Sequence, residues 1–340
     1  MRRALVAALG LLVSAAALLF TFAHVHVHGG LSVTPRFSWA ALMAALRSAQ
    51  PGWLAAFAVL NASSLVPRAA QLRALTLRRD GGRPSRAASW HATAIAMLAQ
   101  NVLPARLGDA VRVVALTRAD DVSMAGAIAG VVLERACDLV ALLVVVCAPG
   151  LWIGRQDPAI GHALRLVLAI GGGLAIVLAI ALLILHREGL VRLARRLRPS
   201  LGRVVASFAT GIGVLAERGR RLPAIVASLA VPLWMAAAFA CSLQAFGLGG
   251  LPTGASLLLV AAVLLAAALP SAPASIGVYD AAVIWLLRAL GAPLASAAAL
   301  ALITHAIGVV AYVGLGLISL LRVGALTTPR PSGTDPSCAG

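Results

Sequence analysis

Long uninterrupted runs of apolar residues constrain this chain more than any other feature of its sequence. A helix needs roughly 20 apolar residues to cross the hydrocarbon core of a membrane, and its backbone must be hydrogen-bonded within its own segment. The runs that approach or exceed this length are 4–23, 51–67, 124–148, 164–185, 222–247 and 297–321. Two further apolar stretches, 87–117 and 251–290, are interrupted by proline, glycine and charge. The sequence predicts an all-α, polytopic integral membrane protein with about six full crossings plus two broken or re-entrant helical hairpins, up to about ten membrane segments.

The charge composition agrees with a membrane protein and argues against a soluble one. Only 11% of the residues are charged and 61% are hydrophobic, whereas about a quarter of a soluble domain is charged. The 28 basic residues are all arginine, and against 11 acidic residues they give a net charge of +17. Most of these arginines lie in short loops between apolar runs, where anionic headgroups are the natural counter-charge. We therefore expect anionic phospholipids as partners and no nucleic acid.

The arginine-rich segments also predict how the chain is oriented. Segments 68–86 and 186–221 and the N-terminal arginine pair should be cytoplasmic, which places both termini inside. The number of crossings between these loops predicts that 87–117 begins and ends on the cytoplasmic side of the membrane. It also predicts that 251–290 begins and ends on the outside. Two broken hairpins entering from opposite faces suggest inverted repeats with a shared site near the midplane. The alternative is that each is a pair of short, tilted crossings without a shared site.

Charged residues inside membrane segments are costly, so they usually line a cavity or pathway. The first such set, in the first broken hairpin, is Asn101, Pro104, Arg106, Gly108, Asp109 and Arg112. Pro104 removes a backbone donor, and Gly108 permits the close approach of another backbone. Arg106, Asp109 and Arg112 recur every three residues, so they share a helical face and can pair. Such a face is suited to holding a phosphate with an arginine fork.

Two further charged sets lie in crossing 124–148 and in the second broken hairpin. They comprise Glu134, Arg135 and Asp138, followed by Pro270, Pro273, Gly277 and Asp280. Glu134 and Asp138 are one turn apart and need cationic partners, for which Arg106 or Arg112 is the natural candidate. Asp280 is expected near the positive end of a helix dipole, where it can compensate Arg288 or contact a cationic headgroup. The alternative is that these charges only hold the helices together.

Motifs for catalysis and metal binding are missing from the sequence. It contains no nucleophile elbow, Walker loop, H-E-x-x-H, dinucleotide fingerprint or C-x-x-C. His305, in the last crossing, is expected to be packed and hydrogen-bonded. The alternating His24, His26 and His28 are expected to lie in a loop without a metal. We therefore expect no enzyme activity, no cofactor and no metal.

At its charged sets the chain resembles the transmembrane flippase domain of bacterial lysylphosphatidylglycerol synthases and their stand-alone relatives. That family carries N-x-L-P-G-R-x-G-E…R, then E-R-x-x-D, then P-x-x-P-G-G-x-G-x-x-E. The matching residues here are Asn101, Leu103, Pro104, Arg106, Gly108, Asp109 and Arg112; Glu134, Arg135 and Asp138; and Pro270, Pro273, Gly277 and Asp280. The chain departs from the pattern at Ala105 and at Ala274-Ser275, where the family has glycine, and at Asp109 and Asp280, where it has glutamate.

The resemblance implies translocation of a lipid rather than its synthesis. We expect a flippase-like domain over 1–323, with a basic cytoplasmic linker at 186–221 and a disordered tail at 324–340. Nothing after Arg322 could supply the family's aminoacyl-transferase domain, so a stand-alone member is expected. Its cargo would be an anionic or aminoacyl-modified phospholipid, or a lipid-linked precursor, crossing a bacterial-type cytoplasmic membrane. The alternative is a non-transporting module that recruits or assists a glycosyltransferase or a lipid-modifying enzyme.

The orientation can be tested by labelling single cysteines. In a background without native cysteines, cysteine at Ala105 or Ala110 should resist an impermeant thiol reagent added from outside, because 87–117 never reaches the far side. Reaction with the same reagent after the cells are opened is the control. Strong labelling of both positions from the periplasm would contradict the re-entrant arrangement.

Overall fold

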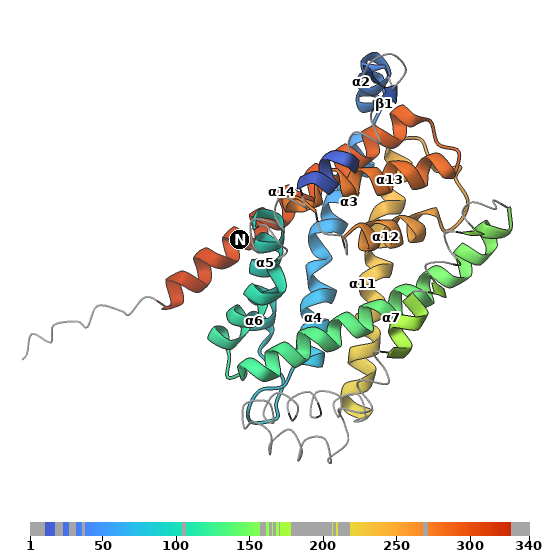
Figure 1. Cartoon of the computed structure of the whole chain (residues 1–340). Coiled ribbons are helices and arrows are strands. Elements are labelled where there is room, and N and C mark those ends of the chain that lie inside the picture. The colour runs from blue at the N-terminus through green and yellow to red at the C-terminus, as the bar shows by residue number, and fades with distance from the viewer. Residues whose placement is uncertain are drawn as a thin grey trace, which may run out of the picture.

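The computed structural model of the chain is predominantly helical (Figure 1). The structure describes residues 11–17, 23–26, 32–35, 38–103, 107–156, 161–162, 165, 168–169, 171–177, 206, 209, 218–267 and 271–327. The helices of the first half are α2 (Trp39–Arg47), α3 (Pro51–Ser63), α4 (Leu65–Leu75), α5 (Arg86–Val102), α6 (Gly108–Ala119) and α7 (Met124–Gln156). Those of the second half are α11 (Arg218–Ala245), α12 (Ala255–Ala266), the 3-10 turn η2 (Pro273–Ser275), α13 (Val278–Ala289) and α14 (Leu294–Thr327).

A short β-hairpin departs from the all-helical expectation. β1 (Ala23–His26) pairs antiparallel with β2 (Ser32–Pro35), with His24 opposite Thr34. The β-branched valines and threonine of these segments favour extended backbone. His24 and His26 thus belong to a strand, so the expectation that they lie in a loop is wrong.

Two of the predicted crossings appear as helices long and apolar enough to span a membrane. Among the described residues these are Gly219–Ala245 and Leu294–Val323, which match the predicted 222–247 and 297–321. Helix α7 covers the predicted 124–148 and continues to Gln156. The predicted 4–23 and 164–185 fall largely outside the described residues, so the full number of crossings stays a prediction.

The expectation that a cytoplasmic loop begins at residue 68 is wrong. The chain continues from α3 into α4 with only Ser64 between them, and α4 runs to Leu75. Leu65, Leu72 and Leu75 are all at most 1% exposed, so burial of this leucine face keeps the chain helical past its first arginine. Arg68 therefore belongs to a buried helix.

Both interrupted stretches form a helix, a break and a second helix, as predicted. In the first, α5 and α6 pack against each other. A methyl group added at Gly108 would lie 2.7 Å from the carbonyl oxygen of Ala96 on α5, so only glycine permits this approach. In the second, η2 interrupts the chain between α12 and α13. Figure 1 shows the two hairpins on opposite sides, with α3 and α4 between them.

The contacts between helices are reciprocal between the two halves. Each half contains a long helical segment, a broken hairpin and a second long helix: α3–α4, α5–α6 and α7, then α11, α12–α13 and α14. The first hairpin packs against α14 through α5, and the second packs against α7 through α12. Likewise, α11 contacts α7 and α3 contacts α14. Exchanging the halves thus maps these contacts onto one another, which is the pattern that internal repeats produce.

The ends of the first hairpin are joined outside its helices by Asp120. Its carboxylate accepts a hydrogen bond from the backbone N–H of Ser85, 2.7 Å away, and lies 3.0 Å from Nε of Arg78. Burial acts to raise the pKa of Asp120, but the backbone hydrogen bonds from Ser85 and Asp121, together with Arg78, outweigh it and lower the pKa. The residue before α5 is thereby tied to the residue after α6.

The turn at η2 contains two left-handed residues that are not glycine. Ala274 and Ser275 have φ angles of 57° and 58°, and they occupy the positions where the sequence pattern that the chain resembles has its glycine pair. An L-residue in this region costs about 1–2 kcal/mol, because its Cβ crowds the following carbonyl oxygen. The pattern's glycines are therefore explained by backbone conformation, and this chain keeps the conformation without them.

Restoring either glycine should stabilise the protein. We expect Ala274→Gly and Ser275→Gly each to raise the free energy of unfolding by about 0.5–1 kcal/mol, the relief of strain exceeding the entropy cost of glycine. Thermal unfolding of purified protein in detergent measures this. Ala272→Gly is the matched control, since Ala272 has an ordinary φ of −57° and should gain nothing. Equal melting of all three variants would show that the turn is not strained.

Candidate functional site

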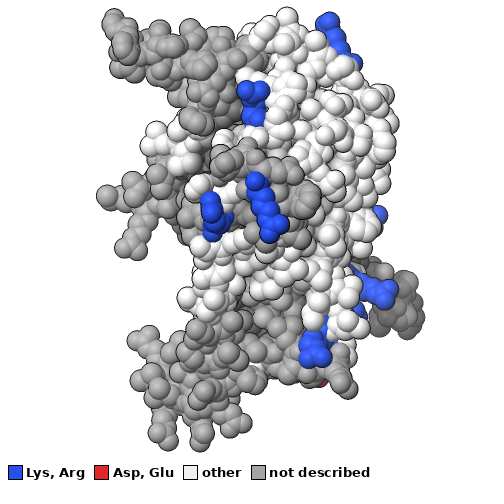
Figure 2. Space-filling view, turned by 90° about the vertical axis from the view of Figure 1, so that its right-hand side faces the viewer, with Lys and Arg blue, Asp and Glu red and all other residues white. Residues whose placement is uncertain are grey.

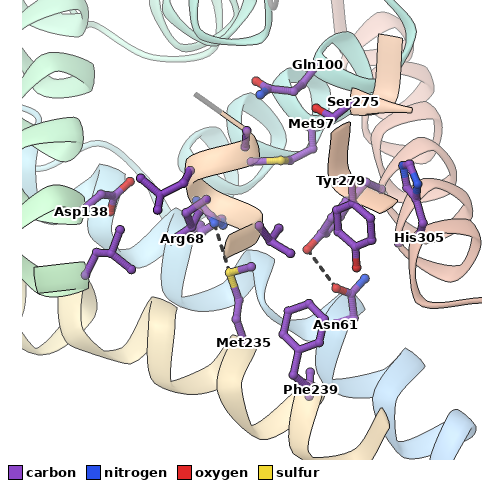
Figure 3. A pocket seen from close by; sticks show the side chains of 18 of the residues that line it. Asn61, Arg68, Met97, Gln100, Asp138, Met235, Phe239, Ser275, Tyr279 and His305 are labelled. Carbon is purple, nitrogen blue, oxygen red and sulfur yellow. Dashed lines mark hydrogen bonds between the residues drawn. The ribbon is translucent and has the colours of Figure 1, made fainter. Parts of the chain in front are cut away.

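A cavity of about 850 Å³ lies between the two halves of the molecule. The first half lines it from α3 to α7, and the second half from α11, α12, η2, α13 and α14 (Figure 3). One part of the wall is apolar and includes Phe57, Leu142 and Phe239. The charged and polar side chains of the wall are Asn61, Arg68, Gln100, Asn101, Asp109, Arg135, Asp138, Ser275, Tyr279, Thr304, His305 and Tyr312. A volume of this size is typical of binding sites for small molecules.

A buried ion pair joins α6 to α7 beside the cavity. Nη1 of Arg112 lies 2.5 Å from Oε1 of Glu134, and the two side chains are 1% and 0% exposed. The prediction that Glu134 has an arginine of the first hairpin as its partner is confirmed. Removing one member of such a pair strands the other charge in a low-dielectric interior, so the pair keeps these helices in register.

Arg135 connects the carboxylates that face the cavity. Its guanidinium contacts both oxygens of Asp109, at 2.7 and 3.1 Å, and Oδ2 of Asp138 at 3.2 Å. Asp138 also accepts a hydrogen bond of 2.8 Å from the amide of Gln71 on α4. Arg112 lies 3.8 Å from Asp109. Three elements, α4, α6 and α7, therefore share one network of charges, in which every carboxylate touches a donor.

Arg68 is a site residue that the sequence reasoning assigned to a loop. It is 7% exposed and lines the cavity, and its Nη2 donates to the sulfur of Met235, at 3.4 Å. Within the described part of the chain, no carboxylate lies within ion-pair distance of it. The signal was present, because Leu65, Arg68, Leu72 and Leu75 follow one another at helical spacing and so share a face.

In the second half, Asp280 pairs with His305 and not with Arg288. Nδ1 of His305 lies 3.1 Å from Oδ1 of Asp280, and its Nε2 lies 2.8 Å from the carbonyl oxygen of Ala274. Arg288 instead donates to the carbonyl of Ala292, so the expected compensation of Arg288 by Asp280 is wrong. Asp280 and Arg288 lie eight positions apart in the sequence, whereas α14 packs against α13 and brings His305 to the carboxylate. His305 lines the cavity, and Asp280 is 3% exposed.

The start of α13 agrees with the sequence prediction. Asp280 lies in the first turn and accepts a 3.0 Å hydrogen bond from the backbone N–H of Gly277. There the carboxylate meets the positive end of the helix dipole. Gly277 has a φ of 83°, and Pro273 opens the η2 turn. Both residues therefore shape the backbone between the two helices.

The remaining predicted residues fall into three groups. Asn101 lines the cavity and donates to the carbonyl of Met97. Gly108 serves the packing of α6 on α5. Pro104, Arg106 and Pro270 lie outside the described residues.

The sequence reasoning also missed a polar cluster in which Tyr312 hydrogen-bonds to Ser64 and to Asn61. Such residues occur singly in apolar helices and carry no motif.

These features define a class: helical membrane proteins that enclose a polar, charged cavity between two halves with broken hairpins. Within this class, the chain belongs to the family of the lysylphosphatidylglycerol synthase TM region, whose model matches residues 7–316. This region is the membrane-embedded, non-catalytic part of the family. No curated protein and no solved structure gives a match.

A double-mutant cycle tests whether the buried pair holds α6 and α7. Glu134→Gln and Arg112→Gln should each lower the free energy of unfolding by about 3–5 kcal/mol, because each strands a buried charge. The double variant should lose clearly less than the sum of both. Detergent melting and denaturant titration measure the losses. The exposed pair Arg79–Asp121, 3.6 Å apart, is the control and should be additive; additivity at 112 and 134 would contradict the coupling.

Proposed function

We propose that this protein is a flippase-like transporter that moves an anionic or aminoacyl-modified phospholipid, or a lipid-linked precursor, across the cytoplasmic membrane. Both termini would lie on the cytoplasmic side. The observation that carries the proposal is the cavity, which joins an apolar wall to a charged one and is lined by both halves. A phospholipid has the same division between its chains and its headgroup.

The arrangement of the two halves supports movement rather than binding alone. In transporters built from inverted repeats, a midplane site formed by broken helices opens to each side in turn as one repeat moves against the other. Here the halves have the same order of elements and reciprocal contacts. The cavity lies where the two hairpins and the long helices α7 and α14 meet.

The outer surface supports contact with lipid. Figure 2 shows a face on which the described residues are mostly uncharged, with separate arginines and very little acid. Helix α14 contributes exposed Val310, Leu317, Ile318, Leu320 and Leu321 to the surface. An apolar surface of this extent would be unfavourable in water, and a bilayer satisfies it.

Lipid movement in proteoliposomes tests the proposal. Purified protein is reconstituted with fluorescent phosphatidylglycerol, aminoacylated phosphatidylglycerol and phosphatidylcholine, and a membrane-impermeant quencher reports the fraction exposed outside. We expect the anionic or aminoacylated lipids to equilibrate faster than in protein-free vesicles. Protein that moves none of these lipids would contradict the proposal. A non-transporting module that recruits an enzyme would then be favoured, and it should instead bind a glycosyltransferase or lipid-modifying enzyme.

Asp280→Asn should fold nearly normally but move lipid far more slowly. Asparagine keeps an oxygen that can accept from the Gly277 N–H, so the start of α13 is retained. His305 loses the carboxylate that its Nδ1 contacts at the cavity wall. We expect at least a tenfold loss of rate, measured in the same vesicles. Asp80→Asn is the matched control, because Asp80 is exposed and lies far from Asp280 in the sequence. A wild-type rate for Asp280→Asn would show that the Asp280–His305 pair is only structural.

A further inference from the structure

We infer that Arg68 is the residue that binds the phosphate of the ligand, and that it selects a singly charged phosphodiester over a diphosphate. The inference deepens the proposed function and rests on it only for the assumption that the cavity admits a lipid. The family pattern of charged residues does not include this arginine. Its role follows from its burial, from the absence of a carboxylate in contact with it among the described residues, and from the charges that surround it.

The first step is the cost of burying Arg68. A charge placed in a membrane interior without a partner costs several kcal/mol. Arg68 is 93% buried, yet within the described part of the chain its side chain donates only to the thioether sulfur of Met235, a weak and uncharged acceptor. Figure 3 shows its guanidinium directed towards Met235, at the cavity wall. A bound anion would place a negative charge in direct contact with this guanidinium.

The second step is that the other cavity charges already have partners. Arg135 contacts Asp109 and Asp138, and Arg112, which does not line the cavity, contacts Glu134. His305 lies between the carboxylate of Asp280 and the carbonyl of Ala274. Among the described residues that line the cavity, Arg68 is thus the cation without a carboxylate contact.

The surroundings of Arg68 fit the chemistry of a phosphodiester. A planar guanidinium forms paired hydrogen bonds to two phosphate oxygens, with the charge delocalised over both groups. Asn61 lines the same cavity, and its side-chain nitrogen has no acceptor within the described part of the chain. Phe57, Phe239 and Met235 form an apolar wall nearby, which suits the glycerol and the acyl chains.

The same charges disfavour a diphosphate. Its second phosphate would need another cation, and the neighbouring arginine of the cavity, Arg135, is already shared by two carboxylates. Those carboxylates, Asp109 and Asp138, also face the cavity and would repel additional negative charge. The cavity therefore favours a phospholipid over a polyprenyl diphosphate, which narrows the cargo.

Equilibrium binding to the full chain in detergent tests this inference. The probes are fluorescent phosphatidylglycerol, a phosphate-free diacyl galactolipid, a polyprenyl diphosphate and soluble glycerophosphoglycerol as a competitor. Wild-type protein should bind phosphatidylglycerol at least tenfold more tightly than either the galactolipid or the diphosphate. Arg68→Gln should weaken phosphatidylglycerol binding by about 10- to 100-fold, the range for a lost charge-assisted hydrogen bond, and leave galactolipid binding unchanged. Arg68→Lys should lie between the two.

Controls separate a ligand contact from a structural role. Arg73→Gln removes an arginine of the same helix that donates to the carbonyl of Pro84 and does not line the cavity, so this variant should bind phosphatidylglycerol as wild type does. Without lipid, Arg68→Gln should melt no lower than wild type, because an uncompensated charge is lost. A lower melting temperature with unchanged lipid selectivity would overturn the inference.

Further outcomes distinguish the ligand site from transport. Wild-type protein that binds the diphosphate as tightly as phosphatidylglycerol, or does not distinguish phosphatidylglycerol from the galactolipid, would overturn the inference. Effective competition by soluble glycerophosphoglycerol would support Arg68 as a phosphodiester site and indicate a soluble source of ligand. If the protein binds phosphatidylglycerol selectively through Arg68 but moves no lipid, the proposed transport is contradicted and the binding role of Arg68 is retained. The two proposals can therefore be rejected independently.

Discussion

The cost of a charge in a low-dielectric interior determines how the central part of this molecule is built. Arg112 and Glu134 are almost completely withdrawn from solvent, and each is tolerable only because the other is in contact with it. This requirement sets the position of α6 on α7. Once these helices are placed, Asp109 reaches Arg135, Arg135 reaches Asp138, and Asp138 reaches Gln71 on α4. The charged wall of the cavity is thus a consequence of one buried pair.

The sequence predicted the elements whose signals are local. Proline and glycine within apolar stretches indicated both broken hairpins, and Gly108 indicated a close backbone approach. The partner of Glu134 was also predicted, because few cations lie within reach of that helix. The position of Asp280 in the first turn of a helix followed from the residues before it. In each of these cases the turn, the close backbone approach, the ion-pair partner or the helix start involves only one or two neighbouring segments of the chain.

What the sequence did not predict depends on packing between distant segments. His305 reaches Asp280 only because α14 lies against α13. Arg68 was assigned to a loop because positive charge usually ends an apolar run, whereas the leucines on both sides of it are buried and continue the helix. The polar residues Asn61 and Tyr312, 251 positions apart, meet only in the folded chain. A single sequence records these residues as isolated, and their relation is a property of the tertiary structure.

The turn η2 packs against α5, so the break of one hairpin touches the first helix of the other. Its backbone is further held by the contact between the Ala274 carbonyl and His305 on α14, and α14 itself packs on α5. Because η2, α14 and α5 are packed together, a displacement of the second hairpin must be accommodated by the first, whether or not a ligand occupies the cavity. The two halves are therefore packed together at this point as one unit.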